Sequence, residues 1–447
     1  MAAPAAGRDG SAAVGSAAGA PAVSSRTVER GHGRGAARPR CGVTIALLVA
    51  LLSAPAASHA RSLASQLHSF IEQNTSIFTV GGIADFVTPA IQQLAVRGVD
   101  FPPTSTAPGF TYRFNVETGT FERSPASLGP VFVERPETIG RGRIDLSLSA
   151  LYGNLDEVDG GGFGTVSTGQ FPVLSGTGPL DVSTALTFED FSLRTSVFYL
   201  STTYGVSDRW DVNALLPAVH TALHVKARRN GVARDTQGNV VARDEGVVNL
   251  DADATGVGDL LLRTKYQLVT SWVLNLALGL VLRLPTGSEG DFQSLGDTVV
   301  TPLLLASRGW GRAHFHGALG VDFNVDDSER DRARYAAGVS FLVREGFGLF
   351  ADVLGTSAFE DDEFTLTTLF PGFLPPPRGV GIAASRRNGP QTTIVAFVPR
   401  SDVVDAALGI KLEVFRSAVA FAGALVPLTS DGLRADVVPA AGIEMSF

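Results

Sequence analysis

The sequence predicts an all-β protein, an antiparallel transmembrane β-barrel of about twelve strands. The first observation is the closing stretch "AAGIEMSF", in which Ala441, Ile443, Met445 and Phe447 share one face because strand side chains alternate. The second is that this alternation of apolar and polar residues persists from residue 141 onward. The third is that short and long connections alternate between the strands, which is typical of outer-membrane barrels.

Composition agrees with this fold class and excludes several functions. Charged residues make up 18% of the chain and the net charge is -8. No run of about 18 apolar residues occurs outside the N-terminal region, so membrane-spanning helices are not predicted. An acidic chain without a basic tract argues against nucleic-acid binding. The only cysteine is Cys41, in the targeting region, which excludes a cysteine nucleophile and a cysteine-ligated zinc site in the mature chain.

Residues 1–60 are predicted to be a disordered extension followed by a signal peptide. Arginines up to Arg40 precede the apolar run "VTIALLVALL", which begins at Val43. This run of about ten residues suits a signal-peptide core and is short for the alternative, a single anchor helix. Small residues precede position 61, and we expect cleavage after Ala60, on the way to the bacterial outer membrane.

Residues 61–136 are expected to form an N-terminal segment that precedes the barrel. Apolar residues at helical spacing predict a short amphipathic helix over 63–73 and a second over 83–94. Alternation on either side of a Thr-Gly pair predicts a small hairpin over 112–121. The segment is expected either to fold into the lumen as a plug or to lie in the periplasm as a cap, and both readings stay open.

Residues 137–447 are expected to form the barrel itself. Over 272–284, for example, the leucines at even positions oppose Asn275 and Arg283. A soluble β-sandwich alternates in the same way, so the loop lengths carry the distinction. We expect strands at 141–156, 184–204, 209–228, 257–270, 272–285, 298–308, 312–325, 332–344, 347–359, 402–415, 418–428 and 434–447.

Every connection after an even-numbered strand of this set is short, whereas most of the others are long. The long ones are 157–183, 229–256, 286–297 and 360–401. An even strand number places both ends of the barrel on the short-turn side, which is the periplasm in outer-membrane barrels. Three tryptophans lie beside short turns and are expected to form an aromatic girdle at the membrane interface. They are Trp210, Trp272 and Trp310.

The polar face of the strands predicts which residues line the lumen. Both charge signs are present in near balance, so the side chains either pair with each other or line a path with no strong charge selectivity. The candidates are Arg143, Asp145, Asp259, Arg263, Lys265, Arg283, His314, His316, Asp322, Arg334, Asp352, Lys411 and Glu413. Asp405 and Glu444 fall on the same face.

The loop over 364–385 is the most apolar external segment. Phe364, Phe370, Phe373 and Leu374 are candidates for catching a hydrophobic ligand at the mouth of the barrel. The alternatives are that these residues fold inward or lie at the outer membrane interface.

Candidate catalytic and metal-binding patterns are sparse. His314 and His316 lie two apart beside Asp322, a spacing that suits a metal but also ordinary lumen lining. The stretch 251–259 resembles the start of a calcium loop but has Leu262 in place of the required glutamate. No G-x-S-x-G elbow occurs, and a lipase-like site would need a serine beside one of the histidines. We expect no enzyme activity, no metal and no cofactor.

Three stretches resemble a known family. They are "ETIGRGRIDLSLSALYGNLDEVDG" (137–160), "STTYGVSDRWDVNALLP" (201–217) and "TGVGDLLLRTKYQL" (255–268), which is followed by "LGLVLRLPTG" (278–287). Together they resemble outer-membrane transporters named for the meta-pathway of phenol degradation, which look like relatives of the long-chain fatty-acid channels. The resemblance covers roughly residues 137–447 and identifies no binding residue.

The resemblance implies passive passage of small hydrophobic or aromatic compounds across the outer membrane. A non-conducting structural barrel is the alternative, and an outer-membrane lipid hydrolase is a third hypothesis. The expected partners are outer-membrane lipid and lipopolysaccharide, a small hydrophobic ligand, and the barrel assembly machinery, which reads a terminal aromatic such as Phe447 in the barrels that this chain resembles.

Overall fold

A computed structural model describes most of the chain after residue 60. The described residues are 61–75, 84, 87–89, 91, 102–103, 111–115, 120–124, 128–167, 171–175, 178–271, 274–294, 296–368, 381–388, 391–415 and 417–447. The predicted signal peptide therefore lies outside the described residues. So does Trp272 of the predicted girdle, while Trp210 and Trp310 are exposed beside short turns.

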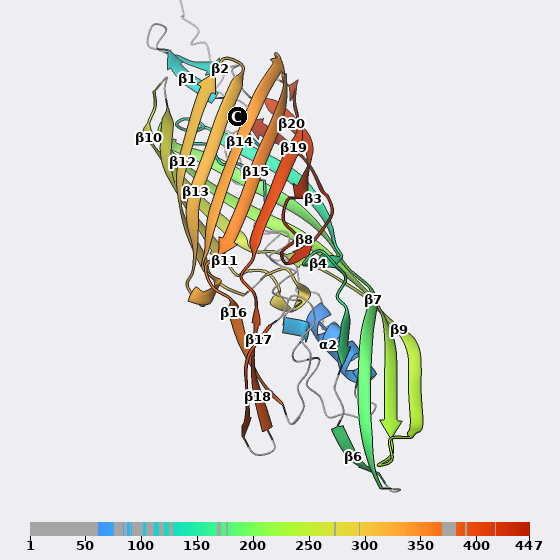
Figure 1. Cartoon of the computed structure of the whole chain (residues 1–447). Helices are drawn as coiled ribbons and strands as arrows, with labels where there is room; N and C mark the ends of the chain where they lie inside the picture. The colour runs from blue at the N-terminus through green and yellow to red at the C-terminus, as the bar shows by residue number, and fades with distance from the viewer. Residues whose placement is uncertain are drawn as a thin grey trace, which may run out of the picture. The chain divides into compact units, whose positions relative to one another are not determined.

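Twelve antiparallel strands pair in sequence order and close into a ring (Figure 1). They are β3 (Ile144–Leu155), β7 (Gly178–Ser207), β8 (Trp210–Arg234), β10 (Leu260–Val269), β11 (Asn275–Leu284), β12 (Val299–Trp310), β13 (Ala313–Asn324), β14 (Arg332–Arg344), β15 (Phe347–Ala358), β19 (Asp402–Phe415), β20 (Ala418–Pro427) and β22 (Val438–Ser446). The predicted all-β barrel of twelve strands is confirmed.

The last strand closes the ring. β22 pairs with β20 on one side and with the first barrel strand, β3, on the other, where Ile443 lies opposite Leu148. The N–H of Phe447 donates to the carbonyl of Ile144 at 2.9 Å, and its own carbonyl accepts from the Ile144 N–H at 3.2 Å. Closure satisfies the backbone groups of both end strands, which a membrane requires.

The two faces of the ring differ in chemistry because the strand period is two. Outward-facing apolar side chains are well exposed, as in Leu148 (53%), Phe198 (55%), Leu319 (62%) and Leu408 (60%). Their neighbours in the chain point inward and are mostly buried. An exposed apolar belt of this kind suits lipid and would be unfavourable in water.

Three strands extend beyond the barrel, which corrects the predicted loop over 229–256. β7 and β8 continue past the ring, and β9 (Val240–Val257) pairs with the extended part of β8 (Figure 1). We call this sheet the strand extension. Its charged sequence, with Gly246 in the middle, resembles a loop, but its alternate residues Val248, Leu250 and Ala252 pack on an apolar cluster.

Other connections contain short elements that the sequence did not reveal. They are β4 (Glu157–Val158), β5 (Thr165–Ser167), β6 (Phe171–Ser175), β16 (Asp362–Thr368), β17 (Gly381–Asn388), β18 (Gln391–Val398), β21 (Leu433–Arg434) and the 3-10 turns η1 (Glu289–Asp291) and η2 (Ser328–Arg330). β16, β17 and β18 form a separate three-stranded sheet, so the predicted long loop over 360–401 is partly structured.

The N-terminal segment contains the first of the two predicted helices and the predicted hairpin, while most of the second predicted helix, over 83–94, lies outside the described residues. The helix is α2 (Leu63–Thr75), and the hairpin is formed by β1 (Thr111–Asn115) and β2 (Thr120–Ser124). α2 contacts β7, β8 and β9 as well as η1, which lies in a long connection. Among the described residues, no helix has the length and apolar character needed to cross a membrane.

Replacing Leu319 with arginine should destabilise the barrel by about 2–4 kcal/mol, because the side chain lies in the middle of β13 on the exposed apolar face. The matched control is Val325→Arg, one residue beyond the end of that strand, where a cost of about 0–1 kcal/mol is expected. Urea unfolding in lipid vesicles measures both. Equal costs at the two positions would contradict a membrane-spanning belt.

Candidate functional site

A segment of fifteen residues, Leu128 to Gly142, lies inside the barrel, and its end is bound to the short turn between β7 and β8, where Asp208 accepts from the Thr138 hydroxyl and the Arg141 N–H. The Lys411 Nζ on β19 donates to the carbonyl of Pro130 at 2.9 Å. The N–H of Phe132 donates to the Asp352 Oδ2 on β15 at 3.2 Å. We call residues 128–142 the lumen segment.

The lumen segment is also bound to the opposite part of the wall. The Lys265 Nζ on β10 donates to the Glu134 Oε1 at 2.8 Å, and both side chains are nearly buried. Glu137 accepts hydrogen bonds from Ser307 on β12 and from the Asn275 Nδ2 on β11. Only a segment that lies inside the ring can contact β10, β11, β12, β15 and β19 at the same time.

An apolar layer fills the middle of the lumen. Inward-facing side chains from most of the strands pack with Val131, Phe132 and Val133 of the lumen segment. They are Leu151, Val197, Tyr199, Leu215, Val219, Leu261, Ala277, Leu305, Ala318, Phe350, Leu354, Ala407, Phe421, Leu425 and Ala440. Porin interiors are polar and water-filled, so this layer distinguishes the barrel from an open porin.

Two cavities adjoin the apolar layer. One of about 410 Å³ lies between apolar side chains such as Val281, Leu303 and Leu305 and the charged Arg263 and Lys265. The other, of about 460 Å³, is lined mainly by apolar residues of β3, β7, β20 and the start of β22, together with the Asp405–Arg434 ion pair. Both volumes are counted with the solvent that opens into the cavities, and each cavity places apolar side chains beside a few charged groups.

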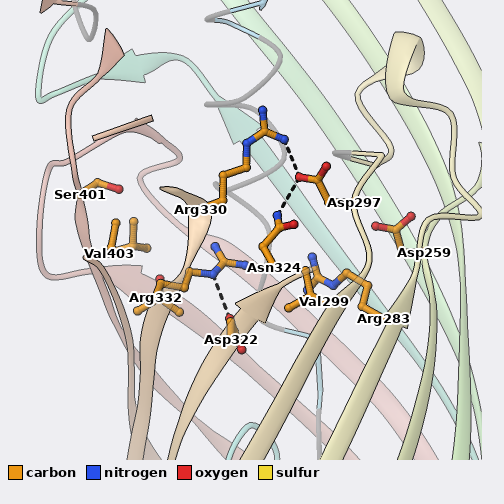
Figure 2. A pocket seen from close by; sticks show the side chains of 12 residues that line it. Asp259, Arg283, Asp297, Val299, Asp322, Asn324, Arg330, Arg332, Ser401 and Val403 are labelled. Atoms are coloured by element: carbon orange, nitrogen blue, oxygen red, sulfur yellow. Dashed lines mark hydrogen bonds and ion pairs between the residues drawn. The ribbon is translucent and has the colours of Figure 1, made fainter. Parts of the chain in front are cut away.

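A polar cavity of about 610 Å³, counted with the solvent that opens into it, lies toward the long connections (Figure 2). The Asp322 carboxylate on β13 receives the Arg332 Nε at 2.9 Å and the Arg334 Nη2 at 2.7 Å. The Thr301 hydroxyl donates to the same carboxylate at 2.7 Å. One carboxylate therefore pairs with two guanidinium groups, and the lining as a whole holds three aspartates and three arginines.

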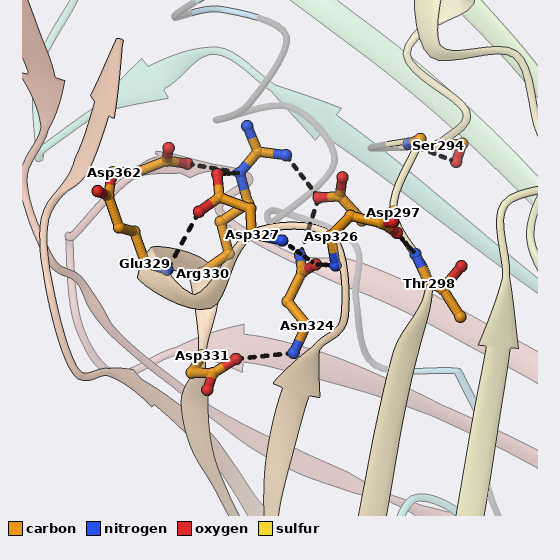
Figure 3. A network of polar contacts seen from close by, with 11 residues as sticks. Ser294, Asp297, Thr298, Asn324, Asp326, Asp327, Glu329, Arg330, Asp331 and Asp362 are labelled. Atoms are coloured by element: carbon orange, nitrogen blue, oxygen red, sulfur yellow. Dashed lines mark hydrogen bonds and ion pairs between the residues drawn. The ribbon is translucent and has the colours of Figure 1, made fainter.

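A polar network joins the connections around that cavity (Figure 3). Arg330 of η2 is paired with Asp297, with Asp327 at 3.3 Å and with Asp362 at 3.2 Å. Burial by itself would lower the pKa of the Arg330 guanidinium, but the carboxylates of Asp362 and Asp297 outweigh it and hold that pKa above its ordinary value. Arg330 therefore stays charged and ties three connections together.

The predicted lumen residues all lie away from the exposed face. Eight of them are buried, namely Asp145, Asp259, Arg263, Lys265, His316, Asp322, Asp352 and Lys411. The five half-buried ones are Arg143, Arg283, His314, Arg334 and Glu413. Arg143 lies in the turn before β3 instead of on the strand. The structure brings together Asp322 with Arg334, and Lys411 with Glu444 at 3.4 Å.

The histidines have ordinary polar partners. The His314 and His316 rings stack at 6.5 Å, and the His316 Nε2 lies 2.9 Å from the Ser340 hydroxyl, inside the barrel and buried. Asp322 binds arginines instead of these rings. In the part of the chain that the structure describes, no group of His, Cys, Asp and Glu is arranged to hold a metal.

The remaining hypotheses from the sequence fall on the extension or outside the described residues. Asp251 lies on β9, where it bonds the His224 Nδ1 at 2.6 Å, so this stretch is a strand instead of a calcium loop. Phe364 begins the part of β16 whose side chains lie outside the described residues. Phe370, Phe373 and Leu374 lie outside them entirely.

Sequence reasoning missed the apolar lumen layer. The signal was present where apolar residues occupy both faces of one strand, as in Leu303, Leu304 and Leu305 or in Leu215 and Leu216. A continuous apolar run indicates a strand that is buried on both faces. In a barrel, such a run means lipid outside and an apolar lumen inside.

The comparisons with known proteins agree with the resemblance drawn from the sequence. Residues 182–364 match the family model described as "Putative MetA-pathway of phenol degradation". The family resemblance is confirmed over this stretch, which is narrower than the 137–447 expected. No curated protein matches the chain.

Several outer-membrane proteins of known structure match the structure of this chain at low sequence identity. An outer-membrane channel from Pseudomonas putida F1 is 12% identical with a TM-score of 0.42, and the match covers 70% of this chain and 98% of that one. A FadL homologue from Pseudomonas aeruginosa is 9% identical (TM-score 0.30; 68% and 89% covered). The toluene transporter TbuX of Ralstonia pickettii is 13% identical (TM-score 0.27; 70% and 92% covered).

Proposed function

We propose that the protein is an outer-membrane channel for the passive passage of small hydrophobic or aromatic compounds. The apolar layer in the lumen carries this proposal, because a path for hydrophilic solutes would be lined by polar groups throughout. The family match supports it, since the family is described by a pathway that degrades an aromatic compound. No covalent step is involved, and movement follows the concentration gradient.

The lumen segment supports the view that the N-terminal part acts as a plug. It closes the short-turn side with contacts from β10, β15 and β19, so passage requires that this segment shifts. The same contacts favour the second candidate function, a non-conducting structural barrel. In that case the lumen segment would be permanent filling.

The experiment that tests the function measures the uptake of toluene and of a sugar of similar size into liposomes that contain the protein. The channel proposal expects faster toluene uptake than in empty liposomes. Leu303→Asn, which places an amide in the lumen cavity, should slow it. Leu304→Asn is the matched control, because Leu304 faces outward with 47% exposure. A barrel that leaves toluene uptake unchanged would support the structural function.

We further propose that the chain is exported with a signal peptide cleaved after Ala60, so that the mature protein begins at Arg61. N-terminal sequencing of the protein from outer-membrane fractions tests the cleavage site. In the membrane, the exposed apolar belt would contact lipid and lipopolysaccharide.

We infer that barrel assembly machinery recognises Phe447. The side chain is 67% exposed and packs little, whereas the backbone of Phe447 completes the pairing with Ile144. Phe447→Ala should therefore lower the amount of barrel in the outer membrane several-fold and leave the unfolding free energy of the inserted protein near its original value. Normal membrane levels of this variant would contradict the inference.

A further inference from the structure

The strand extension has one apolar face outside the twelve-stranded ring. Phe188 and Phe191 of β7, and Leu223 and Val225 of β8, are all buried in one cluster. Phe292, which follows η1, joins them from a long connection. A sheet with an apolar face must bury it against another element, so the cover of this face determines when it is accessible.

α2 covers part of this face, and Ala84, Val87 and Ile91, which follow α2 in the chain, lie buried in the same cluster. Leu63, Leu67, Phe70 and Ile71 follow the helical spacing of one stripe, and all four are buried in the same cluster. Polar contacts hold the two ends of the helix. The Leu63 N–H donates to the Asp291 Oδ1 at 3.0 Å, and the Arg229 Nη1 donates to the Asn74 Oδ1 at 3.2 Å.

The covered face continues into the lumen. Val438, at the start of β22, packs against both the cluster under α2 and the apolar layer in the lumen. On β8 the inward side chains pass from Leu223, in the outer cluster, to Val219, in the lumen layer. Thr221 lies between them, fully buried, and its hydroxyl has no hydrogen-bond partner among the described residues.

We propose that the face under α2 is a binding site for small apolar molecules and that α2 is a displaceable lid that occupies it. The site would accept an aromatic or aliphatic molecule with at most one hydroxyl group, for which Thr221 is the hydrogen-bonding partner. This inference rests on the proposed function and adds the place of capture. If the lid is open for only a fraction of the time, the apparent affinity of the site for its ligand is reduced by that fraction.

A disulfide that locks the lid tests this inference. A Cβ at Gly290 would lie 2.8 Å from the Ser62 Cβ, so Ser62→Cys with Gly290→Cys places two thiols within bridging reach after a small shift. The mature chain has no cysteine of its own after Cys41. In the oxidised double variant, binding of the fluorescent apolar probe N-phenyl-1-naphthylamine should be lost, and dithiothreitol should restore it. Each single cysteine variant is a control and should not respond to dithiothreitol.

A second variant weakens the lid without a cross-link. Ile71→Asp removes an apolar contact that holds α2 on the sheet. Burial of one such side chain shifts the equilibrium toward the closed lid by about tenfold or more, so its loss should strengthen probe binding roughly tenfold. Gln73→Asp, on the exposed side of the same helix, is the matched control and should leave binding unchanged.

The outcomes separate the lid from the channel. Probe binding that is equal in the oxidised and reduced double variants, and unchanged in Ile71→Asp, would overturn the lid even if toluene uptake is observed. Redox-dependent binding without any toluene uptake would support the binding site and overturn the channel function. Probe binding and toluene uptake that both return on reduction would support both.

Discussion

Replacing Lys411 with alanine should lower the free energy of unfolding by about 3–5 kcal/mol, because it leaves a buried carboxylate without its cation. Lys411 is 1% exposed and Glu444 is 3% exposed. The Lys411 Nζ lies 3.4 Å from both Glu444 oxygens. Asp145 lies on the neighbouring strand β3, opposite Ser446 and two residues along β22 from Glu444, so a second buried carboxylate lies nearby.

The double variant Lys411→Met with Glu444→Gln is the control for that prediction. It removes both charges together and should recover most of the lost stability, since replacing a whole buried pair is often neutral. Urea unfolding in vesicles measures all three proteins. A loss below about 1 kcal/mol at neutral pH would show that water reaches the pair.

The fold was predictable because a barrel repeats one simple rule. A period of two sets the face of each residue, and this rule alone placed Asp145, Lys265, Asp322 and Lys411 inside the ring. The predicted bounds of β14 and β19 match those of the structure. A tight turn limits one end of each strand, between β14 and β15 and between β19 and β20, and the alternation of apolar and polar residues indicated the other end.

Pairing between distant residues was not predictable in the same way. The alternation of side chains predicts that Lys411 and Glu444 face inward. Their contact, however, depends on the register of β19, β20 and β22. The lumen segment poses the same difficulty. The Pro130 carbonyl and the Phe132 N–H contact the wall, and nearly every residue type has these backbone groups, proline lacking only the N–H.

The extension and the apolar lumen were missed for a related reason. β9 has acidic residues such as Asp251 and Asp253 along one face, and only the pairing with β8 and the cover by α2 stabilise it as a strand. The lumen was expected to be polar because charged residues mark a face clearly. No facing was predicted from the sequence for Leu215 and Leu305, which the structure shows buried in the lumen layer.

Removing residues 61–142 should convert the closed barrel into a water-filled pore. All twelve strands follow residue 142, so the ring can close without the N-terminal part. A ring of this size exceeds the eight-stranded barrels that side chains alone can fill, and the lumen segment supplies part of the filling here. Single-channel conductance in planar bilayers should rise by an order of magnitude or more, with little preference for either ion sign.

A shorter truncation separates the effect of α2 from the effect of the lumen segment. Removing only residues 61–110 takes away α2 but keeps the lumen segment with its bonds to Lys265, Asp352 and Lys411. This variant should remain closed to ions and to sugars, because the short-turn side is still filled, while its outer apolar face is open to ligand. If both truncations conduct equally, the barrier lies under α2 and not at the lumen segment. If neither conducts, the wall residues themselves fill the ring, and the structural function would be favoured over the channel.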